Sequence, residues 1–182
     1  MPHLAPDLVH QLSQLVAQYI VHQRAHYFSS AGTLSAGQKA AMTGFFSPAV
    51  LEETRLLVLA GERVANPDFY PMLRSMGFGN LPDQSMMTAI TFSDTVVSHT
   101  PFTNELLFHE LVHVEQYRQL GTPKFASLYV RGFLNGDGYE SIPLEQNAYI
   151  LGDMYAQNPA EQFSVAAIIA EWIAKERFLI TL

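Results

Sequence analysis

Residues 104–120, NELLFHELVHVEQYRQL, carry apolar side chains on nearly every face of a predicted helix. The apolar positions are Leu106, Leu107, Phe108, Leu111, Val112, Val114, Tyr117 and Leu120. A helix that is apolar all round is buried in a protein core. His109, Glu110 and His113 lie within this stretch. Because unpaired buried polar groups are costly, these three side chains need partners, and a bound cation would supply one.

The three polar residues form the pattern His-Glu-x-x-His. Residues four apart lie on one face of a helix, so the imidazoles of His109 and His113 can reach a single ion. Glu110 follows His109 by about 100° around the helix, which places its carboxylate beside the ion rather than on it. There the carboxylate can take a proton from a metal-bound water, whose pKa zinc lowers to about 7. The pattern therefore predicts a zinc site with Glu110 as the general base.

The composition limits which other groups such a site can contain. The 182 residues include seven His and no Cys, with ten Lys and Arg against seventeen Asp and Glu and a net charge of -7. Without Cys there is no disulfide, thiol nucleophile or Cys-ligated zinc, so a metal must be held by His and carboxylates. The acidic balance argues against nucleic acid as a partner, since a phosphate backbone needs clustered Lys and Arg.

A catalytic zinc site normally has three protein ligands and a water, so a third ligand is required. The longer patterns that would supply it nearby fail, because Gln116, Gln119 and Phe125 stand where a Gly, a His and an Asp are needed. Glu145, 32 residues after His113 at the start of a predicted helix, is the best candidate. The alternative for Glu145 is a glutamate favoured there by the helix dipole. The lesser candidates for the third ligand are Glu140, Asp137, Asp153 and His99.

The remaining sequence predicts an α+β fold in a single domain, residues 1–182, with a small β section and a mostly helical C-terminal half. Periodicity and breakers predict helices over residues 6–28, 67–76, 104–120, 124–134, 144–156 and about 159–180, with a further short helix after Pro48. Strands are expected over 55–60 and, as one or two strands, over 87–97, with loops at 29–37 and a tight turn at 135–138. Gly121 is expected to end the 104–120 helix.

Two segments carry a resemblance to a known family: HELVHVEQYRQLG at 109–121 and IPLEQNAY at 142–149. They resemble the minimal zincin domains of the glutamate-ligand type, the gluzincins. More narrowly, they are similar to bacterial metallopeptidase domains, including those associated with contractile injection systems and toxins. The likeness covers about residues 45–157 and includes TAITFSDTVVS at 88–98. It implies a zincin-like fold, with a small antiparallel or mixed sheet beside the active-site helix.

The resemblance also implies roles for individual residues. One zinc per chain would be held by His109, His113 and Glu145, with Glu110 as the base. Better-known gluzincins often carry an Asp four residues after the ligand Glu, which orients the first His. Tyr149 stands at that position here, so Asp153 or a backbone carbonyl is expected to orient His109 instead.

Zincin-like folds often place the strand before the active helix over the cleft, where an extended substrate can add as a further strand. The corresponding residues here are Thr91, Ser93 and Thr95, and an ordinary half-buried strand is the alternative. Peptide hydrolysis also needs a donor for the oxyanion. The candidates are Tyr149 and Tyr139, followed by Tyr117 and His99.

These features together predict a zinc metallopeptidase that acts on a peptide or protein, and the alternative is an inactive zincin-like module that binds metal or a partner. An open cleft favours the enzyme, whereas a four-ligand site or a cleft filled by helix 6–28 favours the module. A third alternative is inhibition of a pro-form by that N-terminal segment.

His22 and His26 are expected at the surface. The sequence shows neither a secretory signal peptide nor an apolar stretch long enough to span a membrane, so we expect a cytoplasmic protein, with non-classical export left open.

Overall fold

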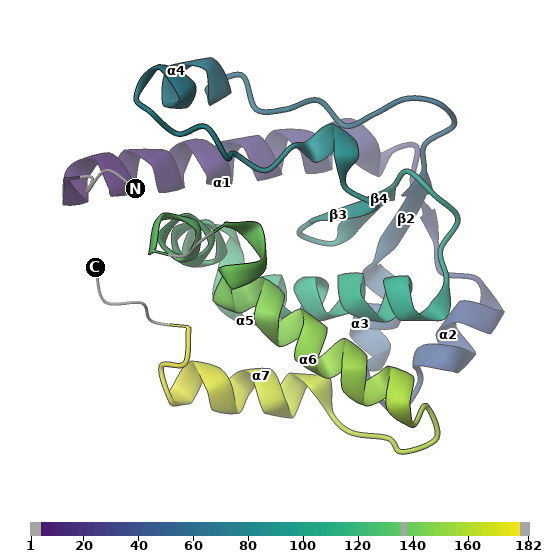
Figure 1. Ribbon diagram of the computed structural model, residues 1–182. Coiled ribbons are helices and arrows are strands. Elements are labelled where there is room, and N and C mark those ends of the chain that lie inside the picture. Colours follow the sequence, from purple (N-terminus) through teal and green to yellow (C-terminus); the bar gives the residue numbers. More distant parts are fainter. Residues whose placement is uncertain (1–4, 136–137, 179–182) are drawn as a thin grey trace.

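The computed structural model describes residues 5–135 and 138–178, and it confirms an α+β fold (Figure 1). The chain begins with the long helix α1 (Pro6–Phe28), as predicted. The further elements are β1 (Gly32–Thr33), α2 (Ala36–Met42), α3 (Pro48–Glu53), β2 (Arg55–Val58), α4 (Tyr70–Ser75), η1 (Gln84–Met86), β3 (Ala89–Phe92), β4 (Thr95–Ser98), α5 (Asn104–Asn135), η2 (Tyr139–Ser141), α6 (Pro143–Gln157) and α7 (Val165–Ala174). Part of the expected turn at 135–138, including Asp137, lies outside the described residues.

The sheet is small and mixed, with the strand order β1-β2-β4-β3. β2 and β4 are parallel, whereas β1 pairs with β2 and β3 pairs with β4 in antiparallel fashion. The predicted β section at 87–97 is thus a hairpin, and Ser93 adopts a positive φ of 62° at its turn. Because β3 is last in the strand order, its outer edge pairs with no other strand of the described chain.

Helix α5 is the centre of the structure and lies between α1 and α7 (Figure 1). Its first turn is capped by Thr103, whose Oγ1 accepts a hydrogen bond of 3.1 Å from the Leu106 N–H. The predicted break at Gly121 is confirmed, since this residue has a φ of 73° and joins two helical segments at a kink. Leu107, Phe108 and Leu111 are fully buried. The expectation of a core helix is therefore confirmed.

The predicted helix over 159–180 is wrong in its extent, because α7 covers only Val165–Ala174. Two contacts fix the start of α7: the Val165 N–H donates to the Phe45 carbonyl at 3.1 Å, and the Ser164 hydroxyl accepts from the Ala167 N–H and caps the helix. After Ala174 the chain turns, and Glu176 adopts a positive φ of 54°. The other differences are small: the helix predicted at 67–76 is shorter, and the loop at 29–37 contains β1 and the start of α2.

Helix α1 forms part of the core rather than a detachable cover. Ile20 and Tyr27 belong to the main apolar cluster around α5. Arg24 also donates two hydrogen bonds, of 2.8 and 2.7 Å, to the Asp94 carboxylate at the β3–β4 turn. Removal of α1 would expose this apolar surface to water, which disfavours its role as an inhibitory segment that can be trimmed away.

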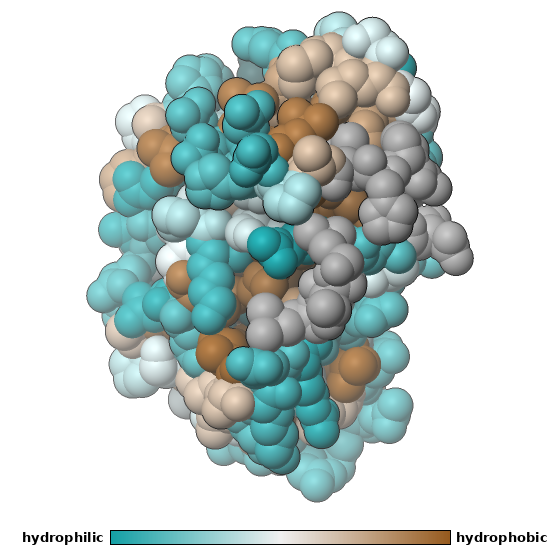
Figure 2. All heavy atoms as spheres, turned by 90° about the vertical axis from the view of Figure 1, so that its left-hand side faces the viewer, coloured by the Kyte–Doolittle hydropathy of each residue, from teal (hydrophilic) through white to brown (hydrophobic). Residues whose placement is uncertain are grey.

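A second apolar cluster lies beneath α4 and the start of α1. Its members are Val9, Leu12, Tyr70, Leu73, Phe78 and Val130. Met72 of α4 and Met76, which directly follows this helix, are exposed. On the face shown in Figure 2, polar residues predominate and apolar residues gather toward the top, at the height of α4. Within the described chain, no helix combines the length and the apolar character needed to cross a membrane.

Gly132 sets the contact between α5 and the start of α6. A β-carbon at this position would lie 2.8 Å from the Pro143 Cδ and 3.3 Å from the Ile142 Cα. The first distance is shorter than real β-carbon contacts, and the second is tight and involves backbone. The absent side chain therefore lets the first turn of α6, which carries Glu145, approach α5 closely.

We expect Gly132→Ala to lower the free energy of unfolding by about 1–3 kcal/mol, because the added methyl overpacks this contact. Gly152→Ala is the matched control, since Gly152 lies in α6 and a methyl group added there would meet only open space. There the substitution should raise stability by up to about 1 kcal/mol through helix propensity. Denaturant unfolding of both variants measures the difference, and equal effects would contradict the close-contact role of Gly132.

Candidate metal centre

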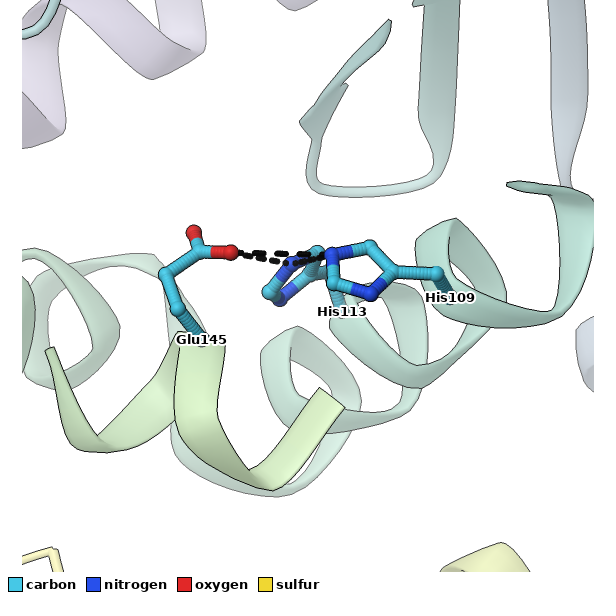
Figure 3. A group of neighbouring side chains, drawn as sticks. All are labelled: His109, His113 and Glu145. Atoms are coloured by element: carbon cyan, nitrogen blue, oxygen red, sulfur yellow. Dashed lines mark hydrogen bonds and ion pairs between the residues drawn. The ribbon is translucent and has the colours of Figure 1, made fainter. Parts of the chain in front are cut away.

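Three side chains converge on one point between α5 and α6 (Figure 3). The Nε2 atoms of His109 and His113 are 3.2 Å apart, and the Glu145 Oε2 lies 3.6 Å from the first and 3.3 Å from the second. A tetrahedral zinc with bonds of about 2.0–2.2 Å separates its ligand atoms by about 3.3–3.6 Å. Both distances to Glu145 fall in this range and the distance between the two imidazole nitrogens is slightly shorter, so the three atoms are spaced nearly as in a zinc ligand set. Among the lesser candidates for the third ligand, the described Glu140 and Asp153 are exposed.

The Glu145 carboxylate is 3% exposed, and its Oε2 has no hydrogen-bond partner in the described residues. Burial by itself raises the pKa of Glu145, but the two histidines outweigh it and hold that pKa well below its usual range. Burial likewise lowers the pKa of His113, whereas the Glu145 charge reverses this effect and raises the pKa to about 9. The site thus strongly favours a positive charge beside Glu145, which a metal cation provides.

Glu110 is held beside this point but is not part of the ligand set. Its carboxylate is 4% exposed, and its Oε2 accepts a 2.6 Å hydrogen bond from the Thr91 hydroxyl of β3. Helix geometry predicts this carboxylate beside the ion. The described structure places it on the wall of two cavities that meet the metal ligands.

The outer cavity is an open groove of about 620 Å³ that reaches His109 and Glu110. It runs between the edge strand and the outer turns of α5 and α6, and its lining includes Met87, Ala89 and Tyr149. No residue of α1 lines it. In the described part of the chain, no fourth His, Asp or Glu joins the three ligands. Of the three ligands, His109 lines this groove.

The inner cavity, of about 90 Å³, lies behind the ligands and is mostly apolar. Its walls come from α1, β3, both halves of α5 and the aromatic residues Phe69 and Tyr70 at the start of α4. Val16, Tyr19 and Ile20 are the contributions of α1. Glu110, His113 and Glu145 form its polar end, so an apolar group placed here would lie next to the metal site.

The four candidates for an oxyanion donor occupy different surroundings. Tyr139 lines both the groove and the inner cavity, and burial together with the Glu145 charge raises its pKa. Tyr149 is half exposed, with its ring centroid 4.8 Å from that of His109. Tyr117 is buried and stacked on Phe125. Of the three phenols, that of Tyr139 is the one that lines both cavities.

His99 is a structural residue, which corrects its candidacy as a ligand or oxyanion donor. Its Nδ1 lies 2.6 Å from the Met87 carbonyl, to which it can only donate, and its Nε2 accepts from the Val64 N–H at 3.1 Å. Both ring nitrogens are therefore occupied by backbone groups. The exposure of His22 and His26 agrees with the expectation that they are surface residues.

The residues of the expected substrate strand separate in space. Thr91 lies on the edge strand, but its hydroxyl is bonded to Glu110. Ser93 is in the hairpin turn, and Thr95 is on β4, which is flanked by β2 and β3. Thr95 therefore has no free edge to offer a substrate.

Asp153 was expected to orient His109. It lines the groove, and within the described residues nothing hydrogen-bonds the Nδ1 of His109, so the expected orienting contact is not made.

Two polar partners of the site were not assigned by sequence reasoning. Gln116 hydrogen-bonds His113, and Thr91 hydrogen-bonds Glu110. The position of Gln116, three residues after His113 on the same helix, is a signal that could have identified it. For Thr91 no local signal exists, because 19 residues separate it from Glu110.

Searches with this chain found no match to a family model, to a curated protein or to a solved structure.

We expect the protein to bind one zinc per chain through His109, His113 and Glu145. The loss of a contact that only orients a ligand lowers metal affinity roughly 10- to 100-fold. Because Glu145→Gln alters a ligand itself, it should weaken zinc binding by more than that. Glu140→Gln is the control, because Glu140 is a nearby exposed glutamate. Metal analysis and chelator competition measure the zinc content and the zinc affinity of both variants. Unchanged zinc affinity in Glu145→Gln would exclude Glu145 as a ligand.

Proposed function

We propose that this protein is a zinc-dependent metallopeptidase of the gluzincin type. The observation that supports this most directly is the tetrahedral spacing of two imidazole nitrogens and one carboxylate oxygen, beside a buried glutamate at an open groove. A three-ligand site open to a groove is the arrangement of catalytic zinc. The open groove and the absence of α1 from its lining favour the enzyme over the inactive module.

The residues divide the chemistry among them. Zinc, when bound, supplies a Lewis acid that lowers the pKa of water toward neutrality and polarises a carbonyl. Glu110 accepts the proton from the attacking water and returns it to the leaving nitrogen. Thr91 fixes the Glu110 carboxylate by its 2.6 Å hydrogen bond. Tyr139, which lines both cavities, would donate a hydrogen bond from its hydroxyl to the oxyanion.

The edge of β3 supplies a place for an extended substrate. The His99 N–H bonds the Thr88 carbonyl, so by the alternation of an antiparallel pair the backbone groups of Ala89 and Thr91 face the free edge. A peptide that pairs there would lie along the groove beside Glu110. One of its apolar side chains would enter the inner cavity, whose walls are mostly apolar.

We expect Glu110→Gln to retain zinc and to lower peptide hydrolysis about 10²–10⁴-fold, because the amide cannot accept the proton. Glu105→Gln is the control, since Glu105 lines the groove one turn earlier on α5 and is exposed. Cleavage of a peptide library, followed by mass spectrometry with parallel metal analysis, provides the measurement. If neither the wild-type protein nor Glu110→Gln contained zinc, the proposed function would be refuted.

Phenylalanine substitutions separate the two tyrosines of the site. Tyr139→Phe should lower kcat about 10²–10³-fold with little change in KM, because it removes an oxyanion donor. Tyr149→Phe should change kcat by much less, since the half-exposed ring that packs on His109 is retained. Steady-state kinetics on one cleaved peptide measures both variants. The reverse ranking would assign the donor to Tyr149.

A further inference from the structure

We propose that Gln116 is a positioning residue that locks His113 and ties it to the helix that carries Glu145. The proposal rests on the metal site of the proposed function but not on peptide hydrolysis. Gln116 is 0% exposed and makes two hydrogen bonds, each of 2.9 Å. Its Oε1 meets the Nδ1 of His113, and its Nε2 donates to the Leu144 carbonyl of α6.

The Leu144 contact fixes the orientation of the amide. A backbone carbonyl can only accept a hydrogen bond, so the NH₂ end of Gln116 must face Leu144. Its carbonyl oxygen must then face His113, and the Nδ1 of His113 must be the donor. These constraints leave the Nε2 of the neutral His113 ring unprotonated, with its lone pair directed at the point shared with His109 and Glu145. Gln116 thereby selects the tautomer that can bind a metal.

The same amide couples two ligands that are distant in sequence. Leu144 directly precedes Glu145, so one side chain spans from the ring of His113 to the backbone beside the third ligand. A buried apolar residue of the same size would leave the Nδ1–H of His113 without an acceptor and would remove the link to the Leu144 carbonyl. Both losses would loosen the spacing of about 3.3 Å between His113 and Glu145.

Gln119 provides a matched comparison within the same helix. Its Nε2 also donates to a carbonyl on another helix, that of Ala166 in α7, at 2.9 Å. Its second contact is with Glu115 rather than with a ligand. Substitution of Gln119 therefore removes a comparable link between helices and leaves the metal site intact.

The test compares Gln116→Met with Gln119→Met, using chelator competition for zinc, the visible absorption of the Co²⁺-substituted protein, and nitrogen-15 NMR of the zinc-loaded protein. The wild-type protein should show a slowly exchanging Nδ1–H on His113. Gln116→Met should lose this protected signal, weaken zinc binding about 10- to 100-fold and alter the Co²⁺ bands. Gln119→Met should keep the wild-type values of all three. Gln116→Glu, which retains an acceptor for Nδ1–H, should recover the NMR signal and most of the affinity.

Several results would overturn the role of Gln116: wild-type zinc affinity in Gln116→Met, equal losses in both Met variants, or a wild-type His113 whose Nδ1 carries no protected proton. The last measurement needs no variant, so it applies even if Gln116→Met does not fold. A wild-type protein that binds zinc but cleaves no peptide would refute the peptidase and leave Gln116 as a positioning residue. A wild-type protein without zinc affinity would refute both.

Discussion

The structure depends on one constraint: a buried carboxylate, Glu145, faces two imidazole nitrogens, and among the described residues its Oε2 has no hydrogen-bond partner. Such a group is stable in the interior only when a positive charge lies beside it. The surrounding packing maintains this arrangement, because α5 supplies both histidines and Gly132 lets the first turn of α6 approach it. The contact between these two helices is therefore where fold and chemistry meet.

Much of this could be predicted from local sequence. His109 and His113 are four residues apart on one helix, so their shared direction follows from helix geometry alone. The apolar residues around them predicted a buried helix, and Gly121 predicted its break; the structure confirms both. Each of these features is decided within a turn or two of helix, which is the range over which sequence patterns carry information.

The remainder depends on contacts between distant segments. The third ligand stayed open among five candidates, because the packing of α6 on α5 determines which carboxylate reaches the histidines. The C-terminal helix begins late because Val165 bonds Phe45, far earlier in the chain. In the sequence, Gln116 is only a mismatch to a longer metal pattern. Its partner Leu144 lies 28 residues away, so its use by the site could not be inferred from the pattern.

Thr91 links the substrate edge to the proposed base, and this coupling bears on how the site would act. Its backbone groups face the free edge of β3, while its hydroxyl bonds the Glu110 carboxylate at 2.6 Å. A peptide that pairs with this edge would therefore immobilise the same residue that orients the base. In the proposed enzyme, the alignment of the substrate and that of the base would then depend on one residue, and such orientation lowers the barrier to reaction. No separate element would then be needed to bring Glu110 into register with a substrate in the groove.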